Sequence, residues 1–282
     1  MRALACLCAV AAVAAFASDV AAGDGGPSPG AMLGWDGVKG PGGRLRYVAL
    51  PGSAASTTVA TVRVRDGRVL TFRLVRGALG VPTVAFDGTT DGVSADGRRL
   101  VLTSAMGGRS PVATKLVILR LPALRALRTI VLPGLWAFDA ISPDGRTIYA
   151  LQYRSADVYS VRSIDALTGK VDPRAIVDLR EPDEAMRGVP TARAWSADRR
   201  WAYTLYAKPN GRAFVHALDT VRREAMCIDL PWRAVGDAIW RVRMRVSSDG
   251  GSLVLRQPGL GVVATIDLGT RAVRASRSLA SA

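Results

Sequence analysis

The sequence has few of the residues on which catalytic and metal sites are most often built. It contains one histidine, His216, and three cysteines, of which Cys6 and Cys8 lie in the apolar start of the chain. The remainder keeps only Cys227, so it can form no internal disulfide. Paired-histidine, phosphate-loop and Cys-x-x-Cys motifs are absent. No enzyme signature of these kinds is present.

Aromatic residues and lysine are also scarce. Aromatics make up 6% of a chain that is 49% hydrophobic, which predicts a core of Val, Leu, Ile and Ala. The net charge of +15 is carried mainly by arginines spread over every segment, whereas a nucleic-acid binder concentrates basic residues on one face or helix. We therefore expect no nucleic-acid partner. A positive surface favours adhesion to an anionic cell-wall polymer or to lipid headgroups.

The N-terminus predicts export. Arg2 precedes an apolar stretch from Ala3 to Ala17, and Val20-Ala21-Ala22 supplies small residues before Gly23. This pattern is typical of a secretory signal peptide, over residues 1–22, and is too short for a spanning helix. A Gly/Pro/Ser-rich linker is expected over 23–33. The mature protein is then secreted or cell-wall associated, extracytoplasmic, with no transmembrane segment.

From residue 34 onward the chain repeats. Short alternating apolar runs are joined by a Ser-x-Asp-Gly turn, whose Asp bonds its own backbone and whose Gly accepts a positive φ. The turn occurs four times, once with Arg199 in place of Gly; the copies begin at Ser94, Ser142, Ser196 and Ser247.

A second repeated feature, a set of equivalent positions before the turns, sets the period of the repeat. Its equivalent positions are Asp36, Asp91, Asp139, Arg193 and Met244, with steps of 55, 48, 54 and 51 residues. A period near 50 with four strands per repeat is typical of propeller blades. We therefore predict an all-β fold over 34–282, a single closed five-bladed β-propeller with four antiparallel strands per blade.

Two motifs carry a resemblance to a known group of proteins. The segments SPDGR (Ser142 to Arg146) and IDALTGKV (Ile164 to Val171) resemble the hairpin signatures of TolB-type and YVTN-type bacterial propellers. As a whole, the chain is similar to uncharacterised exported propellers of high-GC bacteria. The resemblance implies a propeller fold and an export route, and no activity.

The second repeated feature also predicts a site. It falls on the innermost strand of each blade, so Asp36, Asp91 and Asp139 are expected to face one another around the axis, with Arg193 completing the ring. Carboxylates held this close raise one another's pKa or recruit a hard cation such as Ca²⁺. The alternative is structural: each Asp caps backbone amides and Arg193 balances the charge.

Aromatic residues beside the ring suggest a second kind of ligand site at the channel mouth. Trp35, Phe138 and Trp195 either form a platform for a sugar or flat ligand at the channel mouth or pack between blades. Elsewhere, a hairpin centred between Val221 and Arg222 places His216 opposite Cys227. That pair is either a nucleophile with its base, half a metal site, or a packed pair.

The most polar insertion is REPDEAMRG, residues 180–188. Pro182 followed by Asp183 and Glu184 suits the start of one helical turn, which Gly188 would end. Arg180, Asp183, Glu184 and Arg187 are therefore predicted to form an interaction loop on one rim, or a latch between two blades.

These features favour a secreted, non-catalytic binding or interaction module, with a small molecule or a protein at one end of the axial channel. The alternative is a metal-dependent hydrolase or lyase that uses the axial carboxylates with a divalent cation. A third possibility is a structural wall-associated protein that binds through its positive surface. Fold does not decide between these functions, because propellers perform all of them.

Overall fold

The computed structural model describes residues 30–53, 56–104, 112–155, 158–178, 180–181, 186–208, 210–233, 236–275 and 279. Strands β1 to β21 account for nearly all the regular structure, and two short 3₁₀ helices, η1 (Pro41–Gly43) and η2 (Gly236–Arg241), are the only helical segments among these residues. None of the described helices is long and apolar enough to span a membrane. The all-β prediction is correct. The predicted signal peptide lies outside the described residues.

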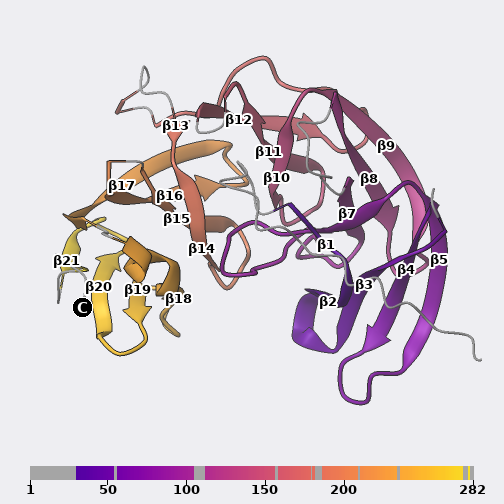
Figure 1. Cartoon of the computed structure of the whole chain (residues 1–282), viewed down its shortest axis with the longest axis horizontal. Helices are drawn as coiled ribbons and strands as arrows, with labels where there is room; N and C mark the ends of the chain where they lie inside the picture. Colours follow the sequence, from indigo (N-terminus) through magenta and orange to yellow (C-terminus); the bar gives the residue numbers. More distant parts are fainter. Residues whose placement is uncertain are drawn as a thin grey trace, which may run out of the picture.

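The strands form five antiparallel sheets in sequence order, four with four strands and one with five. Figure 1 shows them arranged radially like propeller blades, with β2, β10, β14 and β18 near the centre and β5, β9, β17 and β21 outside. The additional strand, β1, pairs with β6 and lies within the segment predicted as linker. The sheets are: first, β2 (Gly34–Lys39), β3 (Leu45–Pro51), β4 (Ser56–Arg63) and β5 (Val69–Arg76); second, β1 (Ala31–Met32), β6 (Leu79–Pro82), β7 (Arg99–Ser104), β8 (Ala113–Arg120) and β9 (Arg125–Pro133); third, β10 (Trp136–Ile141), β11 (Thr147–Tyr153), β12 (Val158–Asp165) and β13 (Met186–Arg187); fourth, β14 (Val189–Trp195), β15 (Trp201–Ala207), β16 (Arg212–Asp219) and β17 (Glu224–Arg233); fifth, β18 (Arg243–Val246), β19 (Ser252–Gln257), β20 (Gly261–Asp267) and β21 (Val273–Ala275).

The four Ser-x-Asp turns share one hydrogen-bonded structure. In each, the Ser hydroxyl donates to the Asp carboxylate and accepts a hydrogen bond from the backbone N–H five residues after the Ser. The fourth residue is in the left-handed region in every copy, with φ of 68° at Gly97, 69° at Gly145, 61° at Arg199 and 74° at Gly250. The repeat therefore holds its backbone conformation even where arginine replaces glycine.

Apolar side chains join each sheet to the next. One cluster of buried residues lies between the first and second sheets, and three more join the second to the third, the third to the fourth and the fourth to the fifth. Most are Val, Leu, Ile and Ala, as predicted. The large buried aromatics are concentrated between the third and fourth sheets, at Tyr149, Tyr159, Tyr206 and Phe214.

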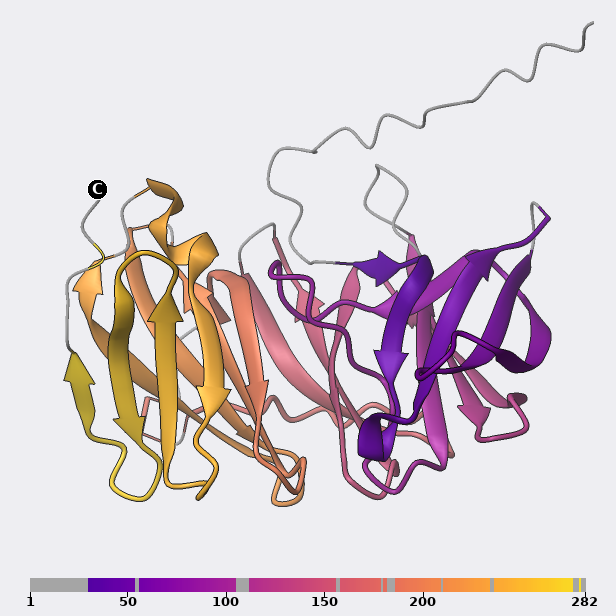
Figure 2. The same cartoon turned by 90° about the horizontal axis from the view of Figure 1, so that it is seen from below.

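The predicted closure of the ring is wrong. Within the described residues, no apolar cluster joins the fifth sheet to the first; the remaining cluster, Val48, Ala60 and Val62, belongs to the first sheet alone. Figures 1 and 2 show an open arc, with the first and fifth sheets at its two ends. A closed ring of these blades therefore needs more than five. The physical reason lies in the fifth sheet, whose outward face carries arginines where a closed ring requires apolar residues.

The space at the centre of the arc is crossed by a segment of the second sheet. After β6 the chain leaves the sheet over residues 83–90 and reaches the fourth, where the N–H of Phe86 donates to Pro190 (2.9 Å) and that of Asp87 to Thr191 (3.1 Å). The Phe86 ring contacts Trp240 of η2 edge-on, with centroids 5.5 Å apart. The sequence pattern did not predict this axial segment, which links the second sheet to the fourth sheet and to η2.

Candidate functional site

A deeply buried ion pair lies beside the axis. Arg193 of β14 donates through Nη2 to Oδ1 of Asp139 on β10, so that the fourth sheet is joined to the third. The two side chains are 0% and 3% exposed. Removing one member of such a pair leaves a charge without compensation in a medium that solvates it poorly.

A second ion pair crosses the axis. Arg199, in the turn between β14 and β15, donates through Nη2 to Oδ1 of Asp91, which lies between the axial segment and β7. Burial raises the pKa of Asp91 above its ordinary value, although the guanidinium groups of Arg199 and Arg193 oppose that effect. The pairing of a fully buried carboxylate with an arginine on a strained backbone ties the second sheet to the fourth.

Trp195 lies between the two arginines. The guanidinium carbon of Arg199 is 4.0 Å from the centroid of its ring, and that of Arg193 is 5.4 Å away. A cation over an indole face is attracted by the ring quadrupole. The indole therefore helps to position both cations that neutralise the axial carboxylates.

Several polar atoms of this group have no hydrogen-bond partner among the described residues. They are Nε and Nη1 of Arg193, Oδ2 of Asp91 and Nε1 of Trp195, all of them buried. Buried donors and acceptors are nearly always paired with protein, water or ligand. The centre of the arc thus contains three donor atoms and one acceptor atom without a protein partner among the described residues.

A pocket of about 380 Å³ opens beside this group. Arg199 forms one wall, so the same guanidinium that holds Asp91 also borders the open space. Acidic and basic side chains meet there. Its other lining residues are Met32, Asp36, Gly37, Val38, Lys39, Gly88, Thr89 and Thr90, from β1, β2 and the axial segment.

The structure brings together four of the six residues predicted to bind a ligand: Asp91, Asp139, Arg193 and Trp195. Asp36 and Trp35 are apart from them on β2, and Trp35 is 59% exposed. The pairing of β2 with β3 is irregular between Gly34 and Val38, which displaces the predicted register there. Asp36 lies instead across the pocket that Arg199 borders.

The predicted face-to-face carboxylates are not observed. An arginine of the fourth sheet is paired with each of the two buried ones, so neither is available as a shared cation ligand. No cluster of three or more His, Cys, Asp or Glu side chains suited to a metal occurs in the described part of the chain. Phe138 is buried between the second and third sheets, which is the packing alternative given for this residue and not the aromatic platform.

His216 and Cys227 face each other across β16 and β17, in the predicted register. The Sγ of Cys227 is 3.9 Å from Nδ1 of His216 and 3.9 Å from Sδ of Met186. Burial lowers the pKa of His216 to about 4, so the imidazole is neutral at physiological pH. The surroundings of Sγ are those of a packed pair in the core.

The predicted rim loop contains a latch. Oδ2 of Asp178 accepts from the N–H of Cys227 (2.7 Å), and Arg180 donates to the Cys227 carbonyl (2.6 Å) and to Asp178 (2.6 Å). These contacts join the chain after β12 to β17 of the next sheet. The acidic partner is Asp178, which the sequence pattern did not single out. Of the other predicted residues, Asp183 and Glu184 lie outside the described residues, and Arg187 lies in the strand β13 (Met186–Arg187), so the described end of the predicted helical turn is a strand.

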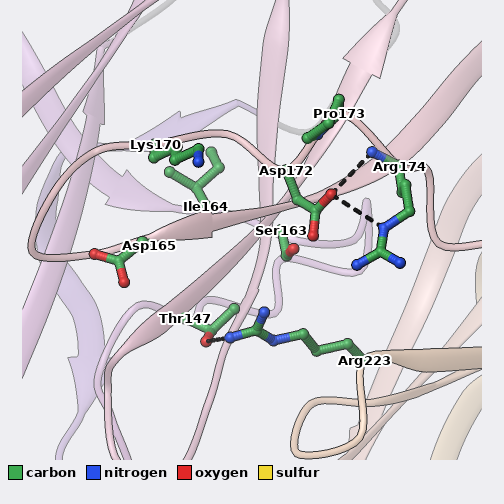
Figure 3. A pocket seen from close by; sticks show the side chains of 9 residues that line it. All are labelled: Thr147, Ser163, Ile164, Asp165, Lys170, Asp172, Pro173, Arg174 and Arg223. Carbon is green, nitrogen blue, oxygen red and sulfur yellow. Dashed lines mark hydrogen bonds and ion pairs between the residues drawn. The ribbon is translucent and has the colours of Figure 1, made fainter.

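A second pocket of about 380 Å³ lies between the third sheet and the β16–β17 hairpin, and Figure 3 shows its side chains. Arg223 reaches from the hairpin and donates to Thr147 (3.3 Å). The carboxylate of Asp165 accepts from the backbone of its own turn, and Asp172 is paired with Arg174. Its polar groups are therefore largely engaged, unlike those at the axis.

No protein-family model matches the sequence, and no curated protein matches it. Solved structures with a similar fold include hydrazine synthase from Kuenenia stuttgartiensis, with 15% identity and a TM-score of 0.50 over 85% of this chain and 70% of that one. TolB from Acinetobacter baumannii is 14% identical, with a TM-score of 0.39 over 82% and 57%. The Cps50 (Swd1) β-propeller domain from Myceliophteria thermophila is 12% identical, with a TM-score of 0.46 over 86% and 68%.

At these identities the comparisons bear on the fold alone. The chain spans little more than half of the TolB structure. TolB and a β-propeller domain are present among the similar structures, and the TolB-type resemblance read from the sequence stays a prediction. Membership of the YVTN group and a high-GC bacterial source stay predictions.

Proposed function

We propose that this protein is an exported, non-catalytic binding module whose ligand binds in the axial pocket beside Arg199. The observation that carries the proposal is the position of this arginine. It occupies a turn position that is glycine in the other three copies, at a φ of 61° that disfavours side chains, and its guanidinium reaches both the buried Asp91 and the pocket. Strain of this kind clusters at functional sites.

The charges in the pocket define the ligand class. One Nη of Arg199 is bound to Asp91, and the side chain remains about one-third exposed at the pocket wall. Lys39 lies on the same lining, opposite the axial segment. Charge-assisted hydrogen bonds from arginine favour carboxylate and phosphate groups. We therefore infer a small ligand with an anionic group bound by Arg199 and Lys39. A second group of the ligand donates a hydrogen bond to the carboxylate of Asp36.

The test is a thermal-shift and calorimetric comparison with defined anions: glutamate, succinate and inorganic phosphate. At least one should raise the melting temperature of the wild type, because a ligand that binds only the folded state stabilises it. Arg199→Gly restores the glycine of the repeat and should abolish the shift. Arg271→Gly is the matched control, since Arg271 also has a positive φ, of 65°, in another turn.

Two results contradict the proposal. One is the absence of any shift by all three anions in the wild type, and the other is an equal shift in Arg199→Gly. Retention on an anionic cell-wall polymer that disappears at high salt and is unchanged in Arg199→Gly indicates the third possibility, adhesion through the general positive surface.

A further inference from the structure

A thiol, a thioether and an imidazole meet where the third sheet packs against the fourth. The Sγ of Cys227 on β17 is 3.9 Å from Sδ of Met186 on β13 and 3.9 Å from Nδ1 of His216 on β16. The thioether comes from the third sheet and the other two groups from the fourth. This sulfur–imidazole cluster, Met186, His216 and Cys227, therefore depends on the packing of two blades.

A hydrogen bond accounts for only part of the arrangement. A thiol has one hydrogen, so Cys227 can donate to Sδ of Met186 or to Nδ1 of His216, but not to both at once. The other ring nitrogen, Nε2, is buried and has no hydrogen-bond partner among the described residues. With the ring proton on Nε2, the cluster therefore brings two lone-pair donors and one ionisable thiol together, which is the composition of a metal site.

The types of donor select the metal. Thiolate and thioether sulfurs are the ligands that Cu(I) prefers, and imidazole is also a ligand of copper. The hard cation Ca²⁺ takes oxygen ligands instead. The methionine is the third ligand that the pattern of one histidine and one cysteine lacks.

The spacing of the donors fits one ion bonded to all three. With bonds of the length that zinc forms, about 2.3 Å to sulfur and about 2.0 Å to nitrogen, an ion at the centre of a planar triangle holds two sulfurs about 4.0 Å apart and a sulfur and a nitrogen about 3.7 Å apart. The measured separations from Sγ of Cys227 are both 3.9 Å. Small side-chain adjustments are then enough to bind the ion.

Charge favours a monovalent ion over a divalent one. Binding converts the Cys227 thiol to a thiolate and releases its proton to water. One thiolate and one Cu(I) have no net charge, whereas Zn²⁺ on the same ligands would keep one positive charge in a buried place, which is costly.

Cys227 is the outermost member of the cluster. It lines a surface pocket of about 350 Å³ beside Arg180, whereas Met186 and His216 are 9% and 1% exposed. Its backbone is fixed on both sides, because its N–H donates to Asp178 and its carbonyl accepts from Arg180. A sulfur that is held in place and partly accessible can receive an ion from the surface and pass it to the two buried donors.

We propose that Cys227, Met186 and His216 bind one Cu(I) ion through Sγ, Sδ and Nδ1. None of these residues lines the axial pocket beside Arg199. The copper site and the proposed ligand pocket can therefore be tested separately, and the failure of one leaves the other standing.

The experiment is an anaerobic competition for Cu(I) between the protein and bicinchoninate, a chelator whose Cu(I) complex is coloured. All variants are made in a full-length chain with Cys6→Ser and Cys8→Ser, so that Cys227 is the only cysteine. This parent protein should withdraw one equivalent of Cu(I) from the chelator and show ultraviolet absorption from thiolate-to-copper charge transfer. Cu(I) should also raise its melting temperature, because the ion binds only the folded state.

Two variants remove one ligand each, and a third is the matched control. Cys227→Ser should abolish the withdrawal of Cu(I). Met186→Leu nearly conserves side-chain volume and should weaken binding by about tenfold or more. Met226→Leu should leave the affinity unchanged, because Met226 is next to Cys227 on β17 but packs on the opposite face, toward the fifth sheet.

Four results overturn the proposal. They are no withdrawal of Cu(I) by the parent protein, equal affinity in the parent and Met186→Leu, equal loss in Met186→Leu and Met226→Leu, and binding of Zn²⁺ as tight as that of Cu(I). Circular dichroism of the metal-free variants shows whether each is folded. If Cys227→Ser does not fold, the comparison of Met186→Leu with Met226→Leu decides.

Discussion

Arg199 and Asp91 belong to blades that are not neighbours, yet they form an ion pair across the axis. The third sheet lies between theirs in sequence, and the pair is possible because the axial segment carries the chain before Asp91 toward the fourth sheet. This one contact connects a strained turn, a fully buried carboxylate and the pocket wall. A substitution of Arg199 should therefore affect both the stability of the fold and the proposed binding.

Arg199→Gly should lower the free energy of unfolding at pH 7 by about 2 kcal/mol, because the strain relieved in the turn is smaller than the effect of leaving a buried carboxylate unpaired. Since burial raises the pKa of Asp91, the folded state takes up a proton more readily than the unfolded state, and the deficit should shrink on acidification. Urea unfolding at pH 5 and pH 8 measures both effects. Addition of Asp91→Asn should restore part of the stability; a further loss shows that the charge is not the cause.

The Arg193–Asp139 pair should show strong coupling. Arg193→Leu and Asp139→Leu are each expected to lower the unfolding free energy by about 3–5 kcal/mol, because each leaves one buried charge without its partner. The double variant should lose less than the sum of the two. A double-mutant cycle by urea denaturation gives the coupling energy, and additive losses contradict the prediction.

His216 should make the protein sensitive to mild acid. Its pKa is lowered from 6.5 to about 4 by burial, so the unfolded chain takes up a proton at a higher pH than the folded one. The unfolding free energy should therefore fall by up to about 3 kcal/mol as the pH drops from 6.5 to 4. It is the only histidine, so His216→Leu should flatten the dependence between pH 5 and 6.5. An unchanged slope contradicts the assignment.

The Asp178–Arg180 pair should contribute more to the free energy of unfolding than the exposed Asp172–Arg174 pair. Burial alone raises the pKa of Asp178, but Arg180 and the N–H groups of Cys227 and Arg180 lower it to about 2. Its contribution is present above the ordinary pKa of 3.8 and is lost as the pH falls toward 2. Asp178→Ala should lower the unfolding free energy by about 2 kcal/mol at pH 7. Asp172→Ala, whose partner Arg174 is 89% exposed, should change it by less than about 0.5 kcal/mol. Equal effects of the two contradict a latch.

The repeat could be predicted from the sequence because the hydrogen bonds that form each turn are local. Each Ser-x-Asp turn is formed by hydrogen bonds within six residues, so four copies predict their own geometry and the strands on either side. The same holds for the pairing of His216 with Cys227, which depends only on the centre of one hairpin. The all-β class and the sheet order follow from such signals.

Local sequence patterns could not predict whether the ring closes or which residues pair with the axial carboxylates. Whether the fifth sheet meets the first depends on the outward face of β18 and β19, where Arg245 and Arg256 replace apolar residues. The loss of glycine at Arg199 was visible as a departure from the repeat, but its partner Asp91 is 108 residues away. The axial segment that brings the two together has no periodicity to predict it.

An arc has ends, and an end blade is held by one apolar interface where a blade in a ring has two. The first and fifth sheets therefore each pack on one neighbouring sheet alone, and among the described parts of the chain these are the units that can separate while the others stay folded. Hydrogen exchange should then be faster in β19 and β20 than in β11 and β15. A molecule that bound against an end blade would slow that exchange, so the exchange rate of the blade would report its occupancy.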